Sequence, residues 1–169
     1  MRGFYSAGIL ARLADAGLRF PLVVGVSSGA LAAAAYVGRR LGGGRELDFG
    51  ALGRSPAALL SPRGLLHPRE GLLRTDAFID LFLDGCWEGV AAARQNLCIP
   101  ATDAATGELV WWETVDFLAG PAALRERAVA SASIPFVMPQ ATVAGRVYAD
   151  GGIRDSIPLR QAEEKGYTR

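Results

Sequence analysis

The residues best suited to chemistry begin at Gly25, where Gly25, Ser27 and Gly29 have the Gly-x-Ser-x-Gly spacing of a nucleophile elbow. A wholly apolar run at 22–24, typical of a buried strand, precedes them, and an Ala-rich stretch that favours a helix follows. The glycines permit a turn too tight for a Cβ, and the serine hydroxyl then projects at the carboxyl edge of the sheet. Ser27 is therefore the predicted nucleophile, and the backbone N–H of Ser28, at the helix start, is a predicted oxyanion donor. The alternative is a plain Gly/Ser turn between a strand and a packed helix.

A serine nucleophile needs a base, and histidine is the usual one. The single histidine, His67, lies between Ser27 and the later acids, whereas the order in α/β-hydrolases is serine, acid, then histidine. His67 also lies in a stretch interrupted by proline and glycine, where a surface or loop position is expected. The sequence order therefore argues against a catalytic His67.

A buried carboxylate can take the place of histidine. Asp150 ends an apolar strand segment and is followed by Gly151 and Gly152, which allow a sharp turn and close backbone approach. Because the carboxyl ends of strands in an open α/β sheet line one crevice, we expect Ser27 and Asp150 to meet there. Asp103 is the rival carboxylate, and we interpret it as a turn residue. An Asp-Gly turn is likewise the alternative for Asp150.

These motifs together resemble the signature motifs of the patatin-like phospholipase family, its bacterial branch especially. The matching segments are Gly-Val-Ser-Ser-Gly at 25–29, Ala-Ser-Ala-Ser-Ile-Pro at 130–135 and the run at 148–158 that contains Asp-Gly-Gly. The resemblance implies a dyad with Ser27 as nucleophile and Asp150 as base. It further implies hydrolysis of lipid or small acyl esters, with no metal, no other cofactor and no catalytic histidine.

The sequence departs from the family pattern at its beginning. The family has a Gly-Gly-Gly-x-Arg-Gly oxyanion loop between its first strand and first helix, and here Arg2 and Gly3 match only the end of that loop. The resemblance assigns Arg2 and Gly3 to the oxyanion motif, and we expect the domain to be incomplete at both termini. Loss of an oxyanion donor lowers turnover about a hundred- to a thousandfold. The alternatives are therefore an inactive remnant, or an acyltransferase that uses the same dyad.

The elements that must position these residues alternate between helices and strands. Apolar spacing predicts helices at 4–16, 30–37, 51–60, 76–83, 121–134 and 158–165, and strands at 22–24, 97–102 and 108–113. Residues 143–148 are predicted to form a hairpin-like segment that leads into Asp150. Alternating strands and helices predict an α/β fold. With the family resemblance, the expectation is a single domain over 1–169 with a three-layer α/β/α arrangement and a mostly parallel sheet.

Net charge, cysteine spacing and the length of apolar runs exclude several classes of protein. Lys and Arg number 18 and Asp and Glu 17, so the net charge of +1 provides no field to recruit nucleic acid. The spacing of Cys86 and Cys98 fits buried thiols in a reducing compartment. Arg12 and Asp15 interrupt any signal peptide, and the apolar run at 22–37 is shorter than the ~20 residues of a membrane span. We expect a cytoplasmic protein with transient contact to a membrane surface.

Overall fold

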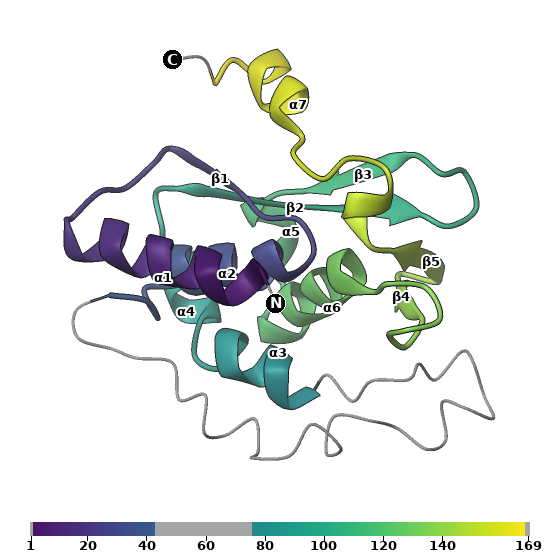
Figure 1. Cartoon of the computed structure of the whole chain (residues 1–169), viewed down its shortest axis with the longest axis horizontal. Helices are drawn as coiled ribbons and strands as arrows, with labels where there is room; N and C mark the ends of the chain where they lie inside the picture. The colour runs from purple at the N-terminus through teal and green to yellow at the C-terminus, as the bar shows by residue number, and fades with distance from the viewer. Residues whose placement is uncertain (1, 43–75, 168–169) are drawn as a thin grey trace.

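The computed structural model of the chain describes residues 2–42 and 76–167 (Figure 1). The predicted helix at 51–60 and His67 lie outside the described residues. The helices are α1 (Arg2–Asp15), α2 (Ser28–Val37), α3 (Asp76–Leu83), α4 (Trp87–Ala91), α5 (Thr114–Phe117), α6 (Pro121–Ala132), the 3-10 turn η5 (Gly151–Ile153) and α7 (Leu159–Glu164). The strands are β1 (Leu22–Val24), β2 (Asn96–Asp103), β3 (Leu109–Trp112), β4 (Ala141–Val143) and β5 (Arg146–Ala149).

The strands form one five-stranded sheet around β2. The pair β1–β2 is parallel, whereas the pairs β2–β3, β2–β5 and β4–β5 are antiparallel. The predicted α/β fold is confirmed, and its described sheet is mixed where we expected a mostly parallel one. The reason is local: β2–β3 and β4–β5 are hairpins with short turns, and a short turn joins only antiparallel strands.

Two strands share one edge of β2. The N–H of Gly25, just after β1, donates a hydrogen bond to the Cys98 carbonyl of β2. The N–H of Ala104, just beyond β2, donates to the Val147 carbonyl of β5. The N–H of Asp103 donates instead to the Glu108 carbonyl, just before β3. Because alternate residues of a strand direct their backbone groups to the same edge, β1 and β5 share one edge of β2 and β3 takes the other. Pro100 lies between the stretches of β2 that pair with β1 and β5.

Helices lie on both sides of the sheet. Figure 1 shows α1, α2, α3, α4 and α6 on one side and α7 on the other. On the α7 side, Lys165 lies over the Trp111 ring and forms an ion pair with Glu113 at the end of β3. Within residues 2–42 and 76–167, no helix combines the length and the apolar character needed to cross a membrane.

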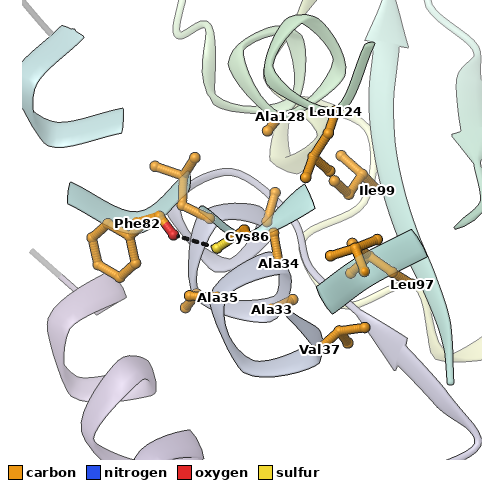
Figure 2. Packing of buried hydrophobic residues seen from close by; sticks show 14 of the residues in the cluster. Ala33, Ala34, Ala35, Val37, Phe82, Cys86, Leu97, Ile99, Leu124 and Ala128 are labelled. Atoms are coloured by element: carbon orange, nitrogen blue, oxygen red, sulfur yellow. Dashed lines mark hydrogen bonds between the residues drawn. The ribbon is translucent and has the colours of Figure 1, made fainter. Parts of the chain in front are cut away.

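Helix α2 is the centre of the core. Its residues from Ala30 to Val37 are all at most 2% exposed, so solvent reaches none of its faces there. Alanine side chains let a helix pack closely against several neighbours at once, and they also favour the helix itself. In Figure 2 three alanines of α2 lie between Phe82, on one side, and Leu97 and Ile99 of β2, on the other; they are Ala33, Ala34 and Ala35. Helix α2, which begins at Ser28 directly after the predicted nucleophile, is therefore a rigid base for Ser27.

Both cysteines are buried free thiols, as the sequence predicted. The thiol of Cys86 donates a hydrogen bond of 2.8 Å to the Phe82 carbonyl, the dashed line in Figure 2. The indole N–H of Trp111 donates to the sulfur of Cys98 at 3.0 Å. Burial raises the pKa of each thiol to about 12. A thiol reacts as its thiolate, so both groups are expected to be inert in the folded chain.

We therefore expect iodoacetamide to leave Cys86 and Cys98 unmodified at neutral pH in the native protein and to modify both in denaturant. Peptide mass spectrometry after a timed reaction measures this directly. Modification of either thiol at the rate of a free cysteine, in protein that remains folded, would contradict the burial of that side chain.

Candidate active site

The turn between β1 and α2 places Ser27 in a strained conformation. Ser27 has φ 58° and ψ −131°, a region that non-glycine residues adopt at a cost of about 1–3 kcal/mol. The turn is also tight at Gly25, where a Cβ atom would lie 2.4 Å from the Gly29 carbonyl oxygen. The N–H of Gly29 closes the turn on the Val26 carbonyl at 2.8 Å. Strain of this kind is typical of a nucleophile elbow, because it forces the hydroxyl outward from the sheet.

Asp150 follows β5 directly and is 5% exposed. The hydroxyl of Ser27 donates a hydrogen bond of 2.5 Å to Oδ2 of Asp150, and the N–H of Gly152 donates to Oδ1 at 2.7 Å. Both carboxylate oxygens are therefore engaged, one by the serine and one by the turn that holds the aspartate. The structure thus brings together the two residues that the sequence paired across 123 positions.

The backbone on either side of Asp150 is fixed by three neighbours. The Asp150 N–H donates to the Ser133 carbonyl at 2.9 Å, and the hydroxyl of Thr102 donates to the Asp150 carbonyl at 2.9 Å. At Gly151 a Cβ would lie 2.5 Å from the Pro100 carbonyl oxygen, so only glycine allows this approach to β2. The aspartate is consequently held between β2 and the end of α6.

The rival carboxylate, Asp103, has a different role. Its Oδ1 accepts hydrogen bonds from the N–H groups of Ala105 and Thr106, at 2.9 and 3.1 Å, and its Oδ2 lies 2.6 Å from Arg146. These contacts, with the hydrogen bond from Ala105 foremost, lower the pKa of Asp103. The interpretation of Asp103 as a turn residue is confirmed. A carboxylate held in its charged form by a turn and an arginine is poorly suited to accept a proton near neutral pH.

The chain matches a protein-family model and several known proteins. The family model described as patatin-like phospholipase matches residues 1–163 of the chain. The chain belongs to the patatin-like phospholipase family. It is also similar to uncharacterized NTE family proteins of Mycobacterium bovis and Mycobacterium tuberculosis, each 32% identical over 164 residues. The match covers 94% of this chain and 41% of each relative, so the patatin-like chain spans about two fifths of their length.

The predicted oxyanion residues of the patatin-like chain lie at two helix starts. Ser28 is the first residue of α2, and its N–H makes no hydrogen bond to any residue in 2–42 or 76–167. Arg2 and Gly3 lie in the first turn of α1. An N–H at a helix start carries a partial positive charge suited to an oxyanion. The roles of these residues remain predictions.

The sequence also did not predict the contact made by the Ser27 N–H. The Ser27 N–H donates a hydrogen bond to the hydroxyl of Ser131, on α6, at 3.1 Å. The only sequence signal for Ser131 was that the segment 130–135 belongs to the family resemblance. Its spacing does not reveal the contact, because Ser131 is 104 residues from Ser27.

Proposed function

We propose that the protein hydrolyses carboxylic esters of lipids through a dyad of Ser27 and Asp150. The observation that carries the proposal is the 2.5 Å hydrogen bond from Ser27 Oγ to Asp150 Oδ2. A buried carboxylate within hydrogen-bond reach of a serine hydroxyl has the geometry of a general base. Membership in the patatin-like phospholipase family supports an ester bond of a lipid as the substrate class.

The proposed reaction has two halves. Ser27 Oγ attacks the ester carbonyl while Asp150 accepts the hydroxyl proton, and the Ser28 N–H stabilises the oxyanion that forms. The carbon–oxygen bond to the leaving alcohol then breaks, and that alcohol takes the proton from Asp150, which leaves an acyl group on Ser27. In the second half, Asp150 accepts a proton from water as the water oxygen attacks the acyl carbonyl. Release of the acid returns the proton to Ser27.

An apolar cavity lined by residues that neighbour Asp150 is our candidate for the acyl-chain site. The cavity has a volume of about 200 Å³ and lies between the chain after α6 and strand β5. Pro135, Met138 and Val147 contribute apolar walls. Ser133 and Ala149 also line the cavity; Ala149 precedes Asp150 in the chain, and the Ser133 carbonyl accepts the Asp150 N–H. Apolar walls beside a polar reaction centre suit a substrate with a polar ester and an apolar tail.

Exposed apolar side chains close to Asp150 in the sequence favour contact with a lipid surface. Ile153 and Ile157 are 58% and 79% exposed, and Arg154 between them is also exposed. Isoleucine side chains can enter the headgroup region of a bilayer, and an arginine can meet anionic phosphates. We therefore extend the proposal to transient binding at membrane surfaces.

Labelling of the nucleophile tests the proposed function. A fluorophosphonate probe is expected to modify Ser27 in the native chain and not in heat-denatured chain, and Ser27→Ala is expected to abolish both labelling and hydrolysis of p-nitrophenyl butyrate. Peptide mass spectrometry identifies the modified residue. A native chain that takes no label would contradict the proposal and favour the inactive remnant.

A further inference from the structure

The point where β1 leaves the sheet is set by a proline. Val24 pairs with Cys98, and the Gly25 N–H donates to the Cys98 carbonyl at 3.0 Å. A regular parallel ladder would continue with the N–H of the residue at position 100 and then with a bond from the Ser27 N–H to the carbonyl at 100. Pro100 has no N–H, so the ladder stops there and the chain is free to turn.

The hydroxyl of Ser131 spans the gap that this leaves. It accepts a hydrogen bond from the Ser27 N–H at 3.1 Å and donates one to the Pro100 carbonyl at 2.6 Å. The Ser131 side chain is fully buried, at 0% exposed. The Ser131 hydroxyl therefore takes the place of the missing direct bond between the two backbones. It pairs with the Ser27 N–H of the strained elbow and with the Pro100 carbonyl of β2. Without the Ser131 hydroxyl, the Ser27 N–H and the Pro100 carbonyl would each lose this hydrogen bond. No other described residue replaces it, and a buried backbone group without a partner is costly.

The same end of α6 also holds the aspartate. Two residues after Ser131, the Ser133 carbonyl accepts the Asp150 N–H at 2.9 Å. Gly151 packs against the Pro100 carbonyl, the acceptor of the Ser131 bond. The backbones of Ser27 and Asp150 are thus attached to neighbouring positions of one helix end, which fixes their separation.

We propose that Ser131 is a positioning residue, which holds the strained backbone of Ser27 so that its hydroxyl points at Asp150. The inference rests on the proposed function for its effect on turnover. Ser131 is fully buried and bonds to the Ser27 N–H and the Pro100 carbonyl, so it acts on the backbone around the dyad and not on the reacting atoms. Its effect should therefore fall on the chemical step rather than on substrate binding.

Ser131→Ala tests this role in ester hydrolysis. We expect kcat for p-nitrophenyl butyrate to fall about ten- to a hundredfold, with KM within about twofold, because a displacement of ~1 Å at a reacting group is enough for a hundredfold loss. Ser131→Thr keeps the hydroxyl and is expected to recover most of the lost kcat. A Ser131→Ala variant with kcat within twofold of the parent chain would overturn the proposal.

Thr114→Ala is the matched control. The Thr114 hydroxyl accepts a hydrogen bond from the Leu97 N–H at 2.8 Å, near the other end of β2. This variant removes a hydrogen bond of the same kind, from a backbone N–H to a side-chain hydroxyl, without touching the dyad. We expect both variants to lower the melting temperature to a similar extent and only Ser131→Ala to lower kcat. Equal losses of kcat would show a general structural effect and overturn the proposal.

Amide hydrogen exchange separates this inference from the proposed function. In Ser131→Ala the Ser27 amide is expected to exchange at least tenfold faster than in the parent chain, while in Thr114→Ala it should be unchanged. If the parent chain hydrolyses no ester, the proposed function fails, and the exchange rate still decides whether Ser131 holds the elbow. An unchanged rate at Ser27 in Ser131→Ala would overturn the inference.

Discussion

Replacement of Asp150 by asparagine is expected to lower kcat for ester hydrolysis by about 10²–10⁴-fold, the range of a general base. Asparagine has the same shape, and its carbonyl oxygen can still accept the hydrogen bond of the Gly152 N–H. The amide NH₂ would then face Ser27, where it can only donate, so the hydroxyl proton has no acceptor. Steady-state kinetics with p-nitrophenyl butyrate measure the loss, and thermal unfolding verifies that the variant is folded.

Two further variants serve as controls for Asp150→Asn. Asp155→Asn changes a carboxylate five residues away, whose Oδ1 caps the turn at the Ile157 N–H at 3.0 Å, and it should leave kcat within about twofold. His67→Ala should also retain activity, since the proposed dyad needs no imidazole. If His67→Ala abolishes hydrolysis and Asp150→Asn does not, the proposed dyad is wrong.

The local elements of the fold could be predicted because each carries its own signal. The apolar run at 22–24 coincides with β1, and the alanine-rich stretch and the proline at 121 mark α2 and α6. The helices α4 and α5 were missed. They have five and four residues, too few for an apolar period to be recognised.

The pairing of Ser27 with Asp150 was predicted from a premise that the structure modifies. The sequence argument placed both at the carboxyl ends of strands with a common direction. In the structure β5 is antiparallel to β2, while β1 is parallel to it, and both use the same edge of β2. The carboxyl ends of β1 and β5 therefore approach each other from opposite directions, and they meet beside Pro100.

The supporting contacts could not be predicted, because they depend on tertiary packing. The hydrogen bonds of Ser131 join α6 to the elbow and to β2 over separations of 104 and 31 residues. No local pattern distinguishes this serine from Ser133, whose hydroxyl bonds within its own helix to the Val129 carbonyl. Residue type thus indicates the proposed dyad, and only the packed structure indicates which contacts hold its two residues in place.

The two glycines of the elbow are expected to differ sharply when each is replaced by alanine. At Gly25 a Cβ would lie 2.4 Å from the Gly29 carbonyl oxygen and 2.6 Å from the Ala30 Cα, both backbone atoms in the first turn of α2. At Gly29 a Cβ would have no atom within 4 Å. Both glycines belong to the Gly-x-Ser-x-Gly motif, but the packing requires glycine only at position 25.

Gly25→Ala is accordingly expected to lower the free energy of unfolding by about 3 kcal/mol and to remove activity, because the elbow must open to admit the methyl group. Gly29→Ala should keep activity and leave stability unchanged or raise it by up to about 1 kcal/mol, because alanine favours the first turn of α2. Denaturant unfolding and fluorophosphonate labelling of Ser27 in the two variants provide the comparison. Equal destabilisation by both substitutions would mean that the close approach of Gly25 to the start of α2 does not hold the elbow together.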